Sequence, residues 1–453
     1  MQRDDHLPLN EIYSTPEALH EEVERILDLA LYKVPEKTPI KLRFITPVSV
    51  ERWLADDRYN DYRLTTPEEH ADSMAYITVS YCWKHTQSTE ILPPLPHYDI
   101  SDWSKTGEPT PIGCPKSVFH RAMLFARSRK CAFIWIDQEC IDQTNMADIQ
   151  AHLKIMHRVY QESEWTVAPL SHPITDHRSL EQLITYLYHD CNFNMDVTKE
   201  ESSEGSPVGE GDVSMFRKHV QATTELLMSI TQDAWFSRTW TFQEKICAAA
   251  LFLLVPVEVS PKTSDKVYLH MIGTDLCFDM AYFDGLSIHH EDDMDQIARL
   301  NNEVKWTKLK SSRLYNCFAI SWDYASFGSW GYYSIFKSIQ DCNNQVVADR
   351  VAIFGHVCRF RNRLTSDMLD GAESSLSACI LALLLGNMDI THDGRLERVA
   401  EIWVKLEERS MFRTAAQDIA AWMMVLLVND FPRRRQRSRH RYLQDRLAVS
   451  TDS

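Results

Sequence analysis

Short apolar runs alternate with helical stripes through the middle of the chain. Tyr76–Tyr81 (YITVSY) and Ala132–Asp137 (AFIWID) have the β-branched and aromatic composition of buried strands. Between them, Val118, Ala122 and Phe125 recur at the spacing of one helix face. The second run is apolar up to its last residue, which is typical of a strand in a parallel sheet covered on both faces.

The same alternation continues toward residue 170. Met146–Glu162 carries a helical apolar stripe, with Asn145 as the predicted N-cap and Asp148 as its capping-box partner. Trp165–Leu170 (WTVAPL) is the next predicted strand. The order strand, helix, strand, helix, strand predicts a parallel sheet with right-handed crossovers, so the expected fold class is α/β.

The flanking segments predict further elements. A helix is expected over 16–31 and a strand over 41–46, and Trp240–Ile246 is expected to begin a helix that leads into an apolar segment. The acidic, Ser/Gly-rich stretch 199–212 has no periodicity and predicts a flexible insertion. Further helices are expected over 215–230, 297–310, 346–362, 375–385 and 395–428. These patterns predict three parts: a lead-in (1–73), an α/β domain (74–260) and a mostly helical C-terminal region (261–453).

The composition argues against several kinds of partner. The 453 residues carry a formal net charge of −16, and phosphate binding requires clustered Lys and Arg, so nucleic acid is not expected as a general partner. The arginine run between 433 and 441 is the local exception and is interpreted as a solvated basic tail. Eleven cysteines without a CxxC pair indicate reduced thiols. With no secretory signal and no apolar run of roughly 18–20 residues, the chain is expected to be cytoplasmic and to span no membrane.

Polar residues gather where the second predicted strand ends. They are Asp137, Gln138, Glu139, Asp142 and Gln143. Ligands of open α/β sheets bind beyond the carboxyl ends of the strands, so a site is expected at this position. Cys140, within the same run, is interpreted as a buried structural thiol. The stretch 289–293 (HHEDD) has the composition of a metal site but no second set of ligands, so no metal site is predicted.

Three blocks of residues carry a family resemblance. They are Tyr76–Trp83 (YITVSYCW), Ile134–Gln143 (IWIDQECIDQ) and Arg238–Glu244 (RTWTFQE). In this order and spacing they resemble the heterokaryon incompatibility (HET) domain of filamentous fungi. The chain departs from the family at Lys84, because a glycine usually follows the first block. The resemblance implies a role in incompatibility and cell-death signalling, through self-association or through binding of partner proteins.

The same blocks resemble, more distantly, TIR domains. That resemblance implies a TIR-like, flavodoxin-like parallel sheet with flanking helices. In NAD-cleaving TIR domains the glutamate four residues beyond a tryptophan is catalytic, and Glu244 occupies that position here. NAD is then a substrate, with no separate cofactor. The binding residues that the resemblance implies are Ser80, Trp83, Asp137 and Trp240.

The chemistry of NAD cleavage is compatible with these residue types. Breaking the bond between nicotinamide and ribose passes through an oxocarbenium-like state, which a nearby carboxylate stabilises. The nicotinamide leaves as a neutral molecule from a cationic ring, so a general acid is less needed. A single glutamate, with Trp83 as a stacking platform, is therefore a sufficient minimal set.

A structural interpretation stands beside each functional one. Glu244 is compatible with a surface or helix-capping glutamate paired with Lys245 or Arg238. Asp137 is compatible with a carboxylate that caps the next turn, and the two tryptophans with core or rim aromatics. Two classes of function therefore stay open: signalling without chemistry, and an NAD glycohydrolase that is activated by assembly.

Overall fold

The computed structural model divides the chain into two compact units. Unit 1 comprises Met1–Val34, Ile320–Gln340 and Gln345–Ser453, and unit 2 comprises Pro35–Ala319 and Asp341–Asn344. The predicted boundaries at 73 and 260 do not coincide with this division. The structure describes residues 1–34, 40–56, 58–71, 73–83, 95–102, 107–188, 210–259, 270–281, 283, 329–370, 373–388 and 391–408.

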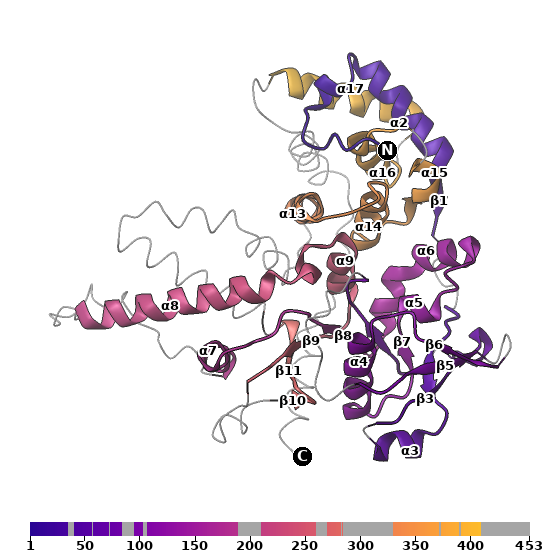
Figure 1. Ribbon diagram of the computed structural model, residues 1–453. Helices are drawn as coiled ribbons and strands as arrows, with labels where there is room; N and C mark the ends of the chain where they lie inside the picture. The colour runs from indigo at the N-terminus through magenta and orange to yellow at the C-terminus, as the bar shows by residue number, and fades with distance from the viewer. Residues whose placement is uncertain are drawn as a thin grey trace. The chain divides into compact units, whose positions relative to one another are not determined.

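Unit 2 is built on one large mixed sheet (Figure 1). In the described ranges the sheet has ten strands, in the order β10-β11-β9-β8-β4-β7-β2-β3-β5-β6. The central strands β7, β4, β8 and β9 are parallel, and the pairs β2–β7 and β9–β11 at either side are antiparallel. The strands are β2 (Ile45–Pro47), β3 (Asp61–Leu64), β4 (Ile77–Val79), β5 (Asp99–Asp102), β6 (Pro109–Pro111), β7 (Ile134–Trp135), β8 (Trp165–Pro169), β9 (Leu251–Pro256), β10 (Met271–Ile272) and β11 (Asp275–Asp279).

The parallel centre follows the predicted alternation. The predicted strands correspond to β4, β7 and β8, and the predicted helices to α4 (Lys116–Ser128) and α6 (Met146–Glu162). The predicted face of α4 is fully buried, as expected for the side that packs on the sheet. Asn145 caps α6 as predicted, because its side-chain oxygen accepts from the backbone N–H groups of Ala147 and Asp148. The prediction of a capping box is wrong. The Asp148 carboxylate accepts from the backbone N–H of Asp142, at 2.7 Å, instead of from that of Asn145.

The antiparallel parts of the sheet correct the prediction of a parallel sheet. Several of these strands have only two to four residues, too few for an alternating pattern to stand out from the sequence. The apolar segment predicted to follow the helix at 240–246 is β9, and this strand follows helix α9 (Thr239–Cys247). Strand β6 contains Pro109 and Pro111 and lies at the edge of the sheet. Proline has no backbone N–H to donate, and an edge strand has no further strand on its outer side that would need such a hydrogen bond. The fold class is thus α/β with a mixed sheet.

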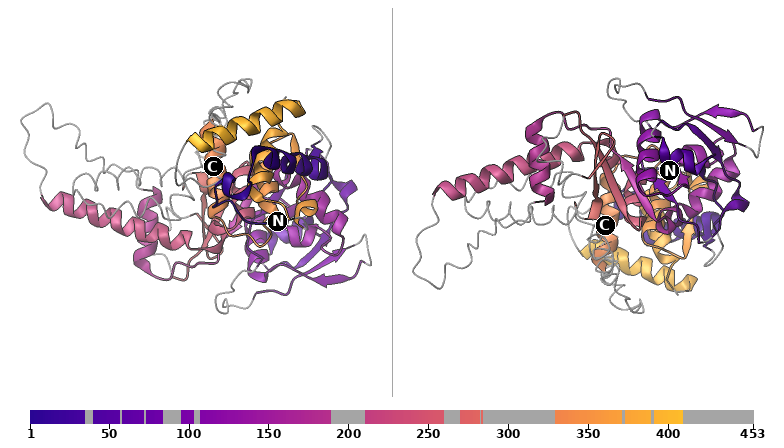
Figure 2. Two further views of the ribbon diagram at one scale, coloured as in Figure 1. Left: turned by 90° about the horizontal axis from the view of Figure 1, so that it is seen from above. Right: turned by 90° about the horizontal axis from the view of Figure 1, so that it is seen from below.

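Two hydrophobic clusters hold unit 2 together. The larger packs α4 and α6 against the sheet and includes Trp53, Phe119 and Trp135. The other covers β8, β9 and β11 with residues of α7 (His177–Tyr188) and α8 (Glu210–Thr231), which lie side by side (Figure 2). The predicted helix over 215–230 is therefore confirmed as part of α8. Of the predicted insertion, residues 199–209 lie outside the described residues, and residues 210–212 begin α8.

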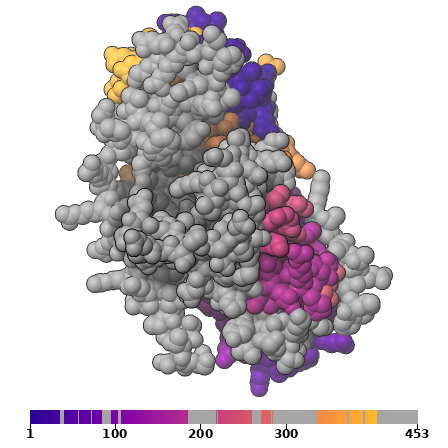
Figure 3. Space-filling view, turned by 90° about the vertical axis from the view of Figure 1, so that its left-hand side faces the viewer, coloured from indigo at the N-terminus to yellow at the C-terminus, as the bar shows by residue number. Residues whose placement is uncertain are grey.

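Unit 1 joins the start of the chain to its C-terminal helices. Helix α16 (Leu376–Leu385) is buried on every side, and α2 (Pro16–Ala30) packs on both α16 and α17 (His392–Glu408). The predicted lead-in helix thus belongs with the C-terminal helices, because its apolar face is buried there. Atoms of the N-terminal segment of unit 1, in indigo, and of α17, in yellow, reach the surface in Figure 3. The other elements of unit 1 are α1 (Leu9–Ile12), α13 (Ser329–Asp341), α14 (Asp349–Val357), α15 (Ser366–Asp370), β1 (Leu31–Lys33) and β12 (Asn362–Leu364).

Other predictions about the second half of the chain have mixed outcomes. The predicted helices over 346–362 and 375–385 are confirmed as α14 and α16, with shorter bounds for α14. The helix predicted over 395–428 is confirmed as far as Glu408, where the description of α17 ends. The predicted helix at 297–310, the stretch 289–293 and the arginine run at 433–441 lie outside the described residues. No described helix combines the length and the apolar character that crossing a membrane requires.

A buried ion pair joins α4 to the antiparallel side of the sheet. Arg121 Nε donates to Asp275 Oδ2 at 2.7 Å, and both side chains are buried. The other guanidinium nitrogens donate to the carbonyl oxygens of Leu170 at 2.6 Å and Leu254 at 2.7 Å. One side chain therefore ties α4 to the end of β8, to the interior of β9 and to the start of β11.

We expect Arg121→Met to lower the free energy of unfolding by about 3–5 kcal/mol, because it leaves the Asp275 carboxylate buried without its cation. The double variant Arg121→Met/Asp275→Leu should recover a large part of that loss, since it removes the orphaned charge. Urea denaturation measures both, with Arg58→Met at an exposed position as a control expected to stay within about 0.5 kcal/mol. Equal losses for Arg121→Met and Arg58→Met would contradict the assignment.

Candidate functional site

The candidate site begins where β4 leaves the sheet. Ser80 directly follows β4, and its backbone N–H donates to the Val167 carbonyl of β8 at 2.9 Å. Along the chain β4, β7 and β8 come in that order, yet β4 lies between the other two in the sheet. The direction of strand succession therefore reverses between β4 and β8, and ligands of open α/β sheets bind at such a point.

Ser80 joins two other buried side chains at this point. Its hydroxyl donates to Glu244 Oε2 at 2.5 Å and accepts from Trp235 Nε1 at 2.7 Å. Ser80, Trp235 and Glu244 are all buried. They come from the end of β4, from a short 3-10 helix (Ala234–Ser237) and from α9. The hydroxyl is therefore used in both directions to fix the carboxyl group against the end of the first parallel strand.

Asp233 holds the 3-10 helix in position. One of its carboxylate oxygens accepts from the backbone N–H of Trp235 at 2.9 Å, which caps the helix. The other accepts from the backbone N–H groups of Ser171 and His172 at 2.6 and 3.0 Å, in the loop after β8. Thr241 in turn donates to the Trp235 carbonyl, so the start of α9 is tied to the same turn. These contacts explain why Glu244 points at the sheet.

Burial raises the pKa of Glu244 to about 8, and the negative charge of Asp137 acts in the same direction. The hydrogen bond from Ser80, the charge of Arg238 and hydrogen bonding with Tyr160 lower the pKa and offset part of this rise. Near pH 7 the group is therefore mainly a neutral carboxylic acid. Strongly perturbed carboxyl groups are concentrated at functional sites, although structural networks perturb them too.

Asp137 forms a second group of contacts at the end of β7. Its Oδ2 accepts from the Trp83 indole N–H at 2.6 Å, and its Oδ1 accepts from the backbone N–H of Gln138 at 2.7 Å. The Tyr81 hydroxyl lies 3.0 Å from Oδ1 and 2.6 Å from Gln138 Oε1. Burial raises the pKa of Asp137, and the hydrogen bonds from Trp83 and Tyr81 oppose that rise. Trp83 is thus attached to the site through its N–H while its side chain is 45% exposed.

The polar run that follows β7 is otherwise structural. Glu139 Oε1 accepts from the backbone N–H groups of Gly113 and Cys114, both at 2.7 Å, and so fixes the approach to α4. Cys140 is fully buried, its thiol faces the Ile134 carbonyl, and burial raises its pKa to about 12. A thiol in that environment is a poor nucleophile, as the sequence-based interpretation holds.

The structure thus brings together four of the five side chains implied by the resemblance, as two pairs. Ser80 contacts Glu244 and Trp83 contacts Asp137, and the charge of Asp137 acts on Glu244. Trp240, one turn before Glu244 on α9, is half-buried and packs against the larger hydrophobic cluster. The interpretation of Glu244 as a surface residue is wrong, because its side chain is buried.

Two residues of the site were not predicted. Trp235 lies in the sequence AWFSRTW, where its only signal was proximity to the third block. Tyr160, on the buried face of α6, interacts with Glu244; the burial of Tyr160 raises its own pKa, and the charge of Glu244 acts in the same direction. Both residues have the pattern of core aromatics, and only the folded geometry shows that Trp235 contacts Ser80 and that Tyr160 contacts Glu244.

Glu244→Gln should alter how the free energy of unfolding depends on pH. In the unfolded chain the carboxyl group loses its proton near the ordinary pKa of 4.5, whereas in the folded chain it keeps the proton up to about pH 8. The free energy of unfolding of wild type therefore falls as pH rises from 4.5 to about 8. The decline is at most about 1.4 kcal/mol per pH unit. Glutamine does not titrate, so the variant should gain on wild type between about pH 5.5 and 8.

Urea midpoints at several pH values across this window measure the effect. Glu51→Gln, at an exposed position in α3 (Val50–Ala55), is the matched control and should run parallel to wild type. If Glu244→Gln also runs parallel to wild type, the buried carboxyl group does not carry the proton proposed for it.

Comparison with protein families gives a match that covers the candidate site. Residues 76–244 match the family model described as Heterokaryon incompatibility protein (HET), and the matched span begins at the first residue of the YITVSYCW block and ends at Glu244. No curated protein matches the chain, and neither does any solved structure. The matched span contains all three sequence blocks and every residue of the Ser80 and Asp137 contacts described above. Residues 76–244 of the chain are therefore a heterokaryon incompatibility (HET) domain.

Proposed function

We propose that this chain acts in heterokaryon incompatibility, triggering cell death through self-association or binding of partner proteins in the cytoplasm of a fungus. The observation that carries the proposal is the family match over residues 76–244. The buried thiols of Cys82, Cys114 and Cys140 support a reducing compartment. The net charge of −16 favours proteins rather than nucleic acid as partners.

The proposal includes a flavodoxin-like, TIR-like arrangement for the parallel part of the sheet. Numbered by their order in the chain, the four central strands β7, β4, β8 and β9 have the spatial order 2-1-3-4. The doubly wound flavodoxin type has the order 2-1-3-4-5, which agrees with these four strands. The antiparallel strands on either side are additions to that core.

Expression of the chain in a filamentous fungus should cause loss of viability that increases with the amount of protein. Signalling through assembly should also give a concentration-dependent increase in mass, measured by sedimentation of the purified full chain. Killing by a chain that stays monomeric at all concentrations, and that captures no partner, would contradict this mechanism. The absence of any effect on viability at expression levels that yield folded protein would contradict the cell-death role itself.

A second candidate function is hydrolysis of NAD to nicotinamide and ADP-ribose. It is favoured by the carboxyl group of Glu244, held by Ser80 at the point where strand succession reverses. In the reaction the bond from C1′ of ribose to the nicotinamide nitrogen breaks, and its electron pair stays with nicotinamide. Water then adds to C1′ and releases a proton. An ionised Glu244 would stabilise the positive charge that develops on the ribose.

The protonation of Glu244 links this second candidate to assembly. With its pKa raised to about 8 by burial, the group is mainly neutral near pH 7 and offers little stabilisation to a cation. An assembled or substrate-bound state that hydrates the carboxyl group, or turns it away from Ser80, would lower the pKa and create the carboxylate. We therefore expect the isolated chain to have low activity that rises on assembly.

Nicotinamide release from NAD should increase more steeply than linearly with protein concentration, and Glu244→Gln should reduce it by about 100-fold or more, as loss of a charge-stabilising group does. Trp83→Ala should weaken it, because the variant loses a stacking surface and the hydrogen bond to Asp137. Glu139→Gln is the matched control for Glu244→Gln. Glu139 is a second carboxylate with a raised pKa, and it contacts backbone N–H groups rather than Ser80.

The same variants separate the two candidate functions. Fungal killing that survives Glu244→Gln, with no nicotinamide release from wild type at any concentration, rejects the hydrolase and retains the signalling role. Loss of both killing and release in Glu244→Gln, with unchanged far-UV circular dichroism and mass, supports the hydrolase.

A further inference from the structure

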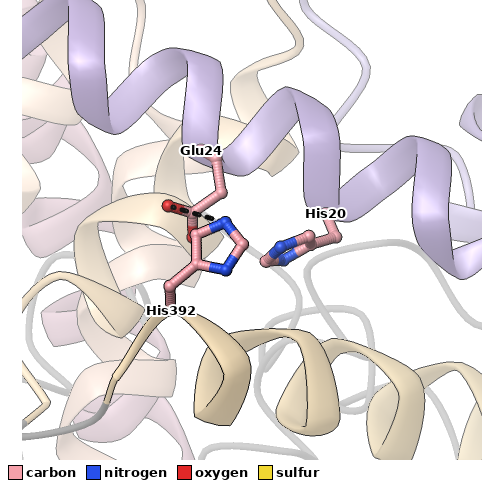
Figure 4. A group of neighbouring side chains, drawn as sticks. All are labelled: His20, Glu24 and His392. Atoms are coloured by element: carbon pink, nitrogen blue, oxygen red, sulfur yellow. Dashed lines mark ion pairs between the residues drawn. The ribbon is translucent and has the colours of Figure 1, made fainter.

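Two histidines and a glutamate meet in unit 1, in a place unrelated to the HET-domain site (Figure 4). His20 and Glu24 are four residues apart on α2, which places them on one face of the helix. His392 is the first residue of α17 and lies against that face. One ligand atom from each of the three residues lies within 4.8 Å of the others.

The side chain of His20 points to a missing ligand. His20 is 6% exposed, and neither Nδ1 nor Nε2 has a hydrogen-bond partner among the described residues. An imidazole buried in this way loses its water contacts without replacing them, which is costly and uncommon in folded proteins. Its ring packs edge-on against the His392 ring, with centroids 4.9 Å apart. Burial disfavours the charged form of the ring and lowers the pKa of His20, and the neutral imidazole is the form that binds a metal.

Glu24 is held in a fixed, ionised state beside the two rings. Arg395 donates to both carboxylate oxygens, at 2.5 and 2.7 Å, and this hydrogen bonding lowers the pKa of Glu24. His392 Nε2 lies 3.9 Å from Glu24 Oε2. A carboxylate has about four lone-pair positions, so two hydrogen bonds from one guanidinium leave the other positions open. Metal-binding carboxylates are commonly oriented by a hydrogen bond of this kind.

We propose that His20, Glu24 and His392 bind a divalent first-row transition metal ion, with Zn²⁺ as the best fit. Two imidazoles and one carboxylate are ligands that zinc prefers, and water would complete a tetrahedral site. Zinc–ligand distances of about 2.0–2.2 Å place tetrahedral ligand atoms roughly 3.3 Å apart, so the three groups must approach one another slightly. The His392 side chain is 62% exposed and has the freedom to make that rotation.

Such an ion would connect α2, near the start of the chain, to α17, the last described helix of unit 1. Glu24 and Arg395 are 371 positions apart in the chain, and the ion would add metal bonds to the contacts between α2 and α17. The role is therefore structural: it closes a long loop of chain and stabilises the packing of α2 against α17. This inference does not depend on the function proposed for the HET domain.

The competing arrangement is an ion pair between Glu24 and Arg395, with the two histidines as neighbours that bind nothing. It accounts for the position of Glu24 but leaves both nitrogens of His20 unsatisfied. This arrangement also predicts that any zinc bound by the chain is held by cysteine thiols elsewhere, and that changes at His392 or Glu24 leave zinc binding unaltered.

The test uses the full chain, freed of metal with a chelator and titrated with Zn²⁺. Wild type should bind one equivalent more than His392→Ala, measured by isothermal titration and by metal analysis after gel filtration. The affinity at this site should fall by about ten-fold or more in His392→Ala and in Glu24→Gln, as expected for lost ligands or their supports. His392→Cys should restore binding, because a thiolate is also a zinc ligand.

His6→Ala is the matched control, since it removes an exposed histidine from the same unit. It should bind zinc as wild type does, and it should show the same zinc-dependent rise in melting temperature. His392 is exposed, so its variants should fold even if those of the buried His20 do not. Equal zinc stoichiometry and affinity for wild type, His392→Ala and Glu24→Gln would overturn the proposal.

Discussion

The hydrogen bond between Ser80 and Glu244 is the contact on which the candidate site depends. It joins the end of the first parallel strand to α9 across 164 positions of sequence, and the carboxyl group that it holds is buried. Burial, together with the charge of Asp137, then makes the group hold its proton near neutral pH. The geometry and the protonation state of the site are therefore consequences of one packing arrangement, which Trp235 and Asp233 maintain.

The central alternation of strands and helices was predictable because each element carries enough residues to show its period. The α4 stripe and the α6 span are read directly from the sequence, and the Asn145 cap adds a local signal. Of the antiparallel strands only β2 was foreseen, because the strand predicted over 41–46 overlaps it; most of the others have two to four residues, which do not establish an alternation. Nor could local patterns place α2 with α16, because that pairing depends on which apolar faces meet after folding.

The candidate site was only partly accessible from the sequence. The family resemblance located Ser80 and Glu244, but not the indole of Trp235, which reaches Ser80 across 155 positions. The resemblance also assigned Trp83 as a stacking surface, while its N–H is used to hold Asp137. The histidine and glutamate cluster of unit 1 gave no motif, because its third member comes from the other end of the chain.

A buried, protonated glutamate explains why signalling and catalysis are not exclusive alternatives for this fold. A neutral carboxyl group held by Ser80 contributes to stability as a satisfied polar group and does no chemistry on a cation. Any event that opens the end of β4 and hydrates Glu244 would convert the same group into a carboxylate beside the reversal point of the sheet. The assembly proposed above would be an event of that kind if it displaced the exposed Trp83, which donates to Asp137. The burial that stabilises the resting chain is thus also what would keep an activity silent until the chain assembles.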